Sequence, residues 1–231
     1  MVAVVENKLL EFSEIFATDV FPFYKQHEET FDVDGIHGVL HIGRSLVASY
    51  ILSKKCNEFG LPSNTTDVLI ATAFHDSGRK NGGKDFWETF SAKNCEEFLK
   101  KKEFNGERLT KTPAEQVASY IVKRGQRNSE ISSTESVDFM CVYDADVLEI
   151  MRPCCGCGGR NSFDQSRLLL YVNDYNFYQY YGKLINEWSQ FILDTEEVKK
   201  ELSTTDCIYK LFEFIESNKV KYPTIYSALH D

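Results

Sequence analysis

Two short segments of this 231-residue chain carry residue types that suit phosphoryl chemistry. His37 and His41 are four residues apart, and Arg44 follows three residues later, a spacing that places all three on one face of a helix. The pair His75-Asp76 comes at the end of an apolar stretch that ends at a glycine. Imidazole and carboxylate groups in such proximity can transfer protons near neutral pH or bind a divalent metal ion.

A third segment, YDADVLEI, places Asp144 and Asp146 inside an otherwise apolar helix. A carboxylate is costly to bury there unless it is paired or ligated. We predict a metal-phosphohydrolase site whose ligands follow one another along the chain. They are His41, His75, Asp76 and Asp144. One divalent metal ion in this set would polarise a phosphoryl oxygen and generate hydroxide. The alternative is a His-Asp pair that only makes a hydrogen bond in the core.

Helical periodicity dominates the chain, and strand-like alternation is scarce. No internal repeat or low-complexity linker divides the chain, so we predict one all-α domain over residues 1–231. The expected helices cover residues 5–21, 35–60, 65–78, 85–104, 112–124, 135–152, a stretch from 167 to 188 and beyond, and 204–217.

Composition narrows the class of protein. Hydrophobic residues make up 42% of the chain, which is enough apolar material for a core. The net charge of -9 disfavours general binding to nucleic acid or anionic membranes. We find no apolar run of membrane-spanning length and no signal peptide, and the odd number of cysteines, seven, favours reduced thiols. We therefore expect a cytoplasmic protein.

The ordered motifs resemble two related families. The arrangement HxxR, then HD, then DAD over residues 36–150 resembles the HD-domain phosphohydrolases, which implies an HD-like helical bundle. The strings HGVLHIGR, AFHDSGR, FWE and DADVLEIMR together look like the phosphodiesterase domain of SidE-type bacterial effectors, over about residues 30–170. This resemblance implies a hydrolase that cleaves phosphoribosyl-linked or ADP-ribosylated ubiquitin, and a secreted effector that acts in a host cytosol. The C-terminal helices would pack on this motif core.

The SidE resemblance also implies that histidines and a glutamate carry out the catalysis without an essential metal, so no cofactor is expected. His37 would be the nucleophile that takes the phosphoryl group, and His41 would hold or orient it. Glu88 of FWE would be the acid-base partner. The family pattern has a second histidine just before DAD, where this chain has Tyr143, a weaker acid at neutral pH.

Arginines complete the expected site. Arg44 and Arg79 would hold phosphate oxygens through their planar guanidinium groups, and Arg152 would face the substrate from the glycine-rich segment 152–160. Two alternatives remain open from the sequence. One is a one-metal HD phosphohydrolase that acts on a free nucleotide. The other is a degenerate module that binds a nucleotide or ubiquitin without turnover, which the tyrosine at position 143 keeps possible.

Overall fold

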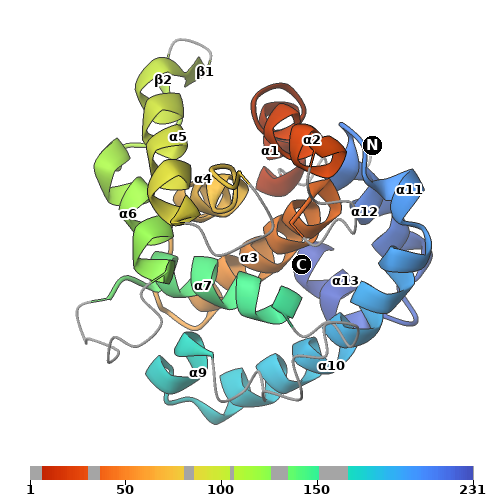
Figure 1. Ribbon diagram of the computed structural model, residues 1–231. Coiled ribbons are helices and arrows are strands. Elements are labelled where there is room, and N and C mark those ends of the chain that lie inside the picture. Colours follow the sequence, from red (N-terminus) through yellow and green to blue (C-terminus); the bar gives the residue numbers. More distant parts are fainter. Residues whose placement is uncertain are drawn as a thin grey trace.

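The computed structural model is all-α, as predicted, apart from one short hairpin (Figure 1). It describes residues 7–30, 37–80, 86–104, 107–125, 135–150 and 166–230. The helices are α1 (Lys8–Ile15), α2 (Phe21–Thr30), α3 (Val39–Glu58), α4 (Thr65–Phe74), α5 (Trp87–Lys101), α6 (Ala114–Gly125), α7 (Val137–Ile150), α9 (Arg167–Tyr171), α10 (Tyr175–Glu197), α11 (Lys199–Leu202), α12 (Cys207–Ser217) and α13 (Pro223–His230), with a π-helical turn, η1 (Phe16–Val20), between α1 and α2. The hairpin pairs β1 (Glu103–Phe104) with β2 (Glu107–Arg108) in antiparallel register.

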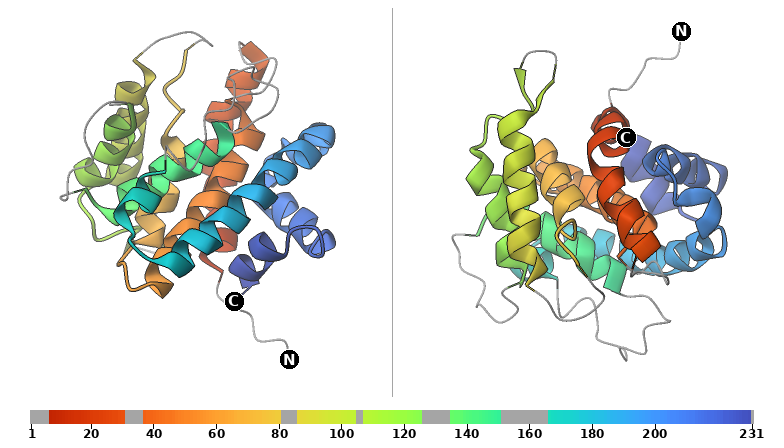
Figure 2. Two further views of the ribbon diagram at one scale, coloured as in Figure 1. Left: turned by 90° about the horizontal axis from the view of Figure 1, so that it is seen from below. Right: turned by 45° about the horizontal axis from the view of Figure 1, so that its top comes forward.

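Helix α3 is the centre of the arrangement. It packs against α4 and α7, and α12 and α13 contact it as well. The pair α5 and α6 covers α4, while the chain from α10 to α13 forms an arc around the other side of α3 (Figures 1 and 2). Among the described residues, no helix has the length and apolarity that a membrane span requires.

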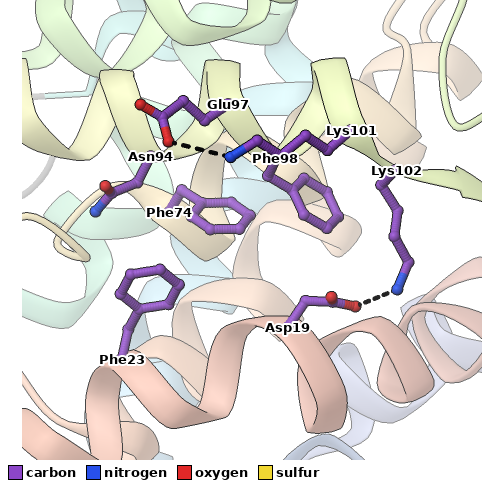
Figure 3. Close-up of a pocket in the computed structure, with 8 residues that line it drawn as sticks. All are labelled: Asp19, Phe23, Phe74, Asn94, Glu97, Phe98, Lys101 and Lys102. Atoms are coloured by element: carbon purple, nitrogen blue, oxygen red, sulfur yellow. Dashed lines mark hydrogen bonds and ion pairs between the residues drawn. The ribbon is translucent and has the colours of Figure 1, made fainter.

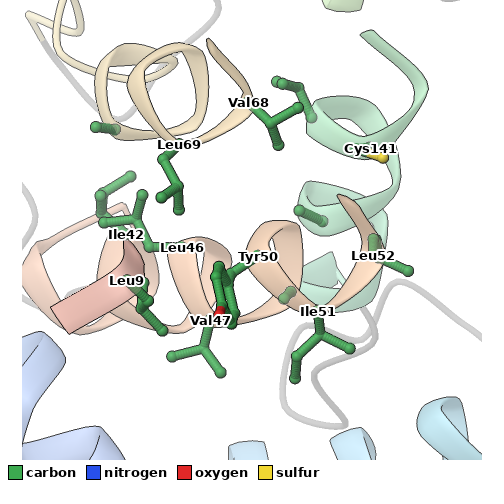
Figure 4. Close-up of a cluster of buried hydrophobic side chains, with 14 of the residues drawn as sticks. Leu9, Ile42, Leu46, Val47, Tyr50, Ile51, Leu52, Val68, Leu69 and Cys141 are labelled. Carbon is green, nitrogen blue, oxygen red and sulfur yellow. The ribbon is translucent and has the colours of Figure 1, made fainter. Parts of the chain in front are cut away.

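The apolar stripe predicted for α3 is buried, and the burial extends to its other faces. Leu40, Val47, Ala48 and Ile51 are each fully buried. Figure 4 shows side chains of α1, α4 and α7 meeting those of α3 in one hydrophobic cluster. Burial of this apolar surface is the main driving force that holds the helices together. It also means that a polar side chain on α3 needs a partner inside the protein.

The helix boundaries differ from the expected ones where capping groups intervene. The backbone N–H of Val39 donates to the carboxylate of Glu28 at 3.0 Å, and α3 begins there instead of at residue 35. His37 therefore precedes the helix and does not share a helical face with His41. The predicted helix 5–21 begins at an Asn7 cap and contains a π-helical turn. Helix α13 was not predicted.

Close packing between α3 and α12 depends on Gly43. A Cβ atom at this position would lie 2.6 Å from Sγ of Cys207 and 2.9 Å from Cδ1 of Leu211. Alanine favours a helix over glycine by about 1 kcal/mol, but overpacking costs about 1–3 kcal/mol. We expect Gly43→Ala to lower the free energy of unfolding in urea titrations by up to about 2 kcal/mol. The double variant Gly43→Ala/Cys207→Ala should lose less unfolding free energy than the losses of the two single variants added together. An increase in the unfolding free energy of Gly43→Ala would contradict this packing.

Candidate active site

The carboxylate of Asp76 lies at the centre of a cluster of ionisable groups. Its Oδ2 atom is 3.1 Å from Nδ1 of His37 and 3.1 Å from Nε of Arg79. The same oxygen lies 3.7 Å from Nε2 of His41 and 3.6 Å from Nε2 of His75. Asp76 is fully buried, whereas the His37 side chain is 26% exposed. The structure thus brings together four residues that the sequence analysis grouped, namely His37, His41, His75 and Asp76.

The turn after α4 positions the His75-Asp76 pair. Helix α4 ends at Phe74, and the Asp76 backbone N–H then donates to the hydroxyl of Tyr24 at 3.3 Å. The Gly78 N–H donates to Oγ of Ser91 on α5 at 2.9 Å. A Cβ at residue 78 would lie 2.4 Å from the Ser91 nitrogen, so a side chain there would push the turn away from α5. This turn is therefore fixed by α2 and α5.

The two buried imidazoles face each other. Nε2 of His41 lies 3.3 Å from Nε2 of His75. Nδ1 of His75 is 2.7 Å from the carbonyl oxygen of Thr72, and because that oxygen can only accept, Nδ1 carries the hydrogen. By the same reasoning, Nδ1 of His41 donates to Glu149, at 3.3 Å. Both Nε2 atoms then present lone pairs toward one point.

Helix α7 supplies two carboxylates to this cluster, and neither was assigned from the sequence. Oδ1 of Asp146 is 3.5 Å from Nε2 of His75 and 3.7 Å from Nε2 of His41. Glu149 contacts the other nitrogen of His41. The signal was present in the sequence, because positions 146 and 149 are one helical turn apart and both residues are acidic within an apolar helix.

Asp144 is not part of the cluster, and the structure corrects its assignment as a ligand. Two residues along a helix are rotated by about 200°, so Asp144 and Asp146 face opposite directions. The Asp144 carboxylate instead accepts from Oγ of Ser166 at 2.5 Å, from the backbone N–H of Arg167 at 2.8 Å and from the hydroxyl of Tyr181 at 3.1 Å. Burial raises its pKa to about 6, although these hydrogen bonds oppose the shift. Asp144 thus anchors α9 and α10.

Arg44 is also placed differently from the expectation. It is fully buried, and its Nε lies 3.0 Å from Oε2 of Glu149. Its remaining nitrogens donate to Thr195 at 3.1 Å and to Glu196 at 2.9 Å, both on α10. The guanidinium group is therefore committed to protein partners inside the core. This replaces the assignment of Arg44 as a phosphate-binding residue.

Of the other predicted site residues, Arg79 contacts the cluster. The guanidinium carbon of Arg79 stacks 3.6 Å from the ring centre of Trp87, while its Nε pairs with Asp76. Glu88 is half-buried in the first turn of α5 and makes no hydrogen bond or ion pair with the described residues. The ring of Tyr143 packs 4.3 Å from the Arg167 guanidinium. Arg152 lies outside the described residues.

The donor set of the cluster fits a single divalent cation. Ligand atoms of His41, His75 and Asp146 all lie within 4.8 Å of one another, as do those of His37, His41 and Asp76. Two imidazole lone pairs and two carboxylate oxygens repel one another unless a proton or a cation lies between them. The group His41, His75 and Asp146 would hold the metal ion that the HD-type alternative requires, with Asp146 in the place expected for Asp144, and Asp76 lies in the neighbouring group that shares His41.

Comparison with known proteins decides the family. Residues 47–216 match the model of the SidE phosphodiesterase (PDE) domain, which is more than half of the chain. The chain belongs to the SidE phosphodiesterase domain family. This SidE-type chain is accordingly a phosphodiesterase, a hydrolase. The match contains His75, Asp76 and Asp146, and it begins after His37 and His41. No curated protein and no solved structure matched the chain.

A surface pocket elsewhere on the SidE-type domain does not coincide with this cluster. It encloses about 260 Å³ between η1, α2 and α5, and Figure 3 shows Phe23, Phe74 and Phe98 along it. Ion pairs of Lys101 with Glu97 and of Lys102 with Asp19 line its edge. None of the predicted site residues lines this pocket.

Proposed function

We propose that this SidE-type domain hydrolyses a phosphodiester of a phosphoribosyl group, with His37 as the nucleophile. The observation that carries the proposal is the His37–Asp76 pair. The buried Asp76 carboxylate lies 3.1 Å from Nδ1 of the partly exposed His37 imidazole, at the edge of a cluster that also contains His41, His75 and Asp146. Such a carboxylate orients the ring, places the lone pair on Nε2 and stabilises the positive charge that the ring gains on attack.

The proposed reaction has two steps. Nε2 of His37 attacks phosphorus, a nitrogen–phosphorus bond forms, and the bond from phosphorus to the leaving oxygen breaks. The leaving oxygen takes a proton from a general acid, for which Glu88 and Tyr143 are the candidates. Water then attacks the phosphorus, the nitrogen–phosphorus bond breaks, and the water loses a proton to the group that acted as the general acid in the first step, which regenerates both that acid and His37. Asp76 remains ionised throughout.

Other residues of the cluster support this step. His41 would hold or orient a phosphate oxygen, and Arg79 would offer its outer nitrogens to a second oxygen. The stack on Trp87 and the pair with Asp76 hold the Arg79 guanidinium in one orientation. A planar guanidinium that is fixed in this way loses less conformational entropy when it binds an anion.

The proposed substrate is ubiquitin joined through phosphoribose to a serine, or its ADP-ribosylated precursor. This proposal is supported by membership of the SidE phosphodiesterase family and by the motif resemblance. Cleavage of the bond between phosphorus and the serine oxygen would release ubiquitin that still carries phosphoribose. We further propose that the protein acts as an effector in a host cytosol.

A second candidate function is favoured by the cation-binding geometry. In this scheme a one-metal phosphohydrolase acts on a free nucleotide, and His41, His75 and Asp146 would hold the metal, with Asp76 beside them. When bound, such an ion supplies Lewis-acid polarisation of the phosphoryl group and a more acidic water. In this scheme His37 would orient the substrate.

Cleavage of serine-linked phosphoribosyl-ubiquitin in excess EDTA tests the proposed function and separates the two schemes. We expect a gel shift to show release of phosphoribosyl-ubiquitin at the same rate with and without the chelator. Loss of release in EDTA, recovered by Mn²⁺ or Mg²⁺, would instead support the metal-dependent function. A panel of free nucleotides with added metal ions is the parallel assay for that function.

A further inference from the structure

Glu149 makes a set of contacts that neither reaction scheme uses directly. Its carboxylate is fully buried and joins three side chains from two other helices. Oε1 accepts from Nε1 of Trp188 at 3.1 Å, and Oε2 is 3.0 Å from Nε of Arg44 and 3.3 Å from Nδ1 of His41. We call the residues His41, Glu149, Arg44 and Trp188 the Glu149 network.

The Glu149 carboxylate has a cationic partner besides His41. A buried carboxylate requires a cationic partner, and Arg44 already supplies one with two nitrogens. Arg44 is held in turn by Thr195 and Glu196 on α10. The position of Glu149 is thus set by α3 and α10 independently of His41, and the imidazole meets a preformed acceptor.

We propose that Glu149 is a positioning residue that holds His41 in the tautomer with hydrogen on Nδ1. A carboxylate only accepts hydrogen bonds, so the neutral ring must donate through Nδ1 and keep its lone pair on Nε2. Nε2 is the atom that faces His75 and Asp146. The inference rests on the proposed function, in which His41 acts on the phosphate, and it makes α10 a structural part of the active site.

Glu149→Gln tests this role because the amide is similar in size to the carboxylate. It places an NH2 donor where the carboxylate has one of its two oxygens. Both carboxylate oxygens face donors in the structure, so the glutamine cannot satisfy all of its neighbours. When its N–H faces His41, the ring must accept at Nδ1 and carry hydrogen on Nε2. When the amide oxygen faces His41 instead, the ring keeps its hydrogen on Nδ1, so the variant should show a mixture of the two His41 tautomers in place of one.

The first readout does not depend on turnover. Long-range ¹H–¹⁵N spectra of the metal-free protein should show neutral His41 with hydrogen on Nδ1 in the wild type and a mixture of the two tautomers in Glu149→Gln. The second readout is kinetic. Loss of such an outer partner typically lowers activity by about 10- to 100-fold, and we expect this in kcat with KM changed by less than about twofold.

Glu187→Gln is the matched control. Glu187 also lies on α10, but its carboxylate accepts the backbone N–H groups of Thr224 and Ile225 at the start of α13. This variant should lose stability and retain the wild-type kcat and His41 tautomer. Trp188→Phe provides a second test in case Glu149→Gln fails to fold, because it removes one donor to Glu149 and keeps an aromatic ring. Its kcat should fall by roughly three- to tenfold at unchanged KM.

Three results would overturn the inference: hydrogen on Nε2 of His41 in the wild type, an unchanged tautomer in Glu149→Gln, or wild-type kcat in both Glu149→Gln and Trp188→Phe. If the wild type cleaves no phosphodiester, the proposed function fails. The tautomer spectra then still decide whether Glu149 positions His41.

Discussion

Replacing His37 with alanine is expected to lower kcat for the diester by about a thousandfold or more while the protein stays folded. The imidazole is the proposed nucleophile, and the other two imidazoles of the cluster, His41 and His75, are buried. Because His37 precedes α3 and is 26% exposed, its removal should change the free energy of unfolding by less than about 1 kcal/mol. Steady-state kinetics and urea titration measure the two effects separately.

His230→Ala is a closely matched control for this substitution. His230 is 30% exposed and also pairs with a carboxylate, Glu216, at 3.0 Å, but it lies on α13 outside the cluster. Its replacement should leave kcat at the wild-type value. If His37→Ala keeps full activity, the histidine-nucleophile scheme is excluded. A severalfold loss that is accompanied by metal dependence would assign His37 an orienting role beside a cation.

Replacing Arg44 with methionine is expected to cost about 3–5 kcal/mol of unfolding free energy. The substitution preserves much of the side-chain volume but leaves the carboxylate of Glu149 buried without its cationic partner. It also removes the donors to Thr195 and Glu196 that tie α3 to α10. Urea unfolding at neutral pH, followed by far-UV circular dichroism, gives the change.

Lys102→Met provides the comparison for Arg44→Met. Lys102 pairs with Asp19 at 2.8 Å, but both side chains are partly exposed, and such pairs contribute about 0–1 kcal/mol. The phosphate-binding role first expected for Arg44 predicts a different outcome, namely near-normal stability and a raised KM. That result would contradict the buried network and return Arg44 to the substrate site.

The sequence was sufficient to predict the all-α class, because helical periodicity is a local property. The grouping of His37, His41, His75 and Asp76 was an interpretation of the order of the motifs and of the family resemblance. The choice between Asp144 and Asp146 could not be made in this way. Both aspartates lie in the same apolar segment, and only the rotation of α7 against α3 and α10 decides which carboxylate faces the histidines.

The role of Arg44 could not be predicted for a related reason. An arginine near two histidines has the same spacing whether it binds a phosphate or a buried carboxylate. Its partner Glu149 lies 105 positions further along the chain, and its anchors on α10 are more distant still. Such pairings depend on tertiary packing, which residue spacing within one segment does not report. The sequence likewise placed Trp188 on a helix but did not predict its hydrogen bond to Glu149.

The most direct test of the central claim is cleavage of serine-linked phosphoribosyl-ubiquitin in excess EDTA, with wild type and His37→Ala measured side by side. The proposed function predicts that the wild type releases phosphoribosyl-ubiquitin and that His37→Ala does not. Absence of release by the folded wild type, or equal release by both proteins, would contradict it.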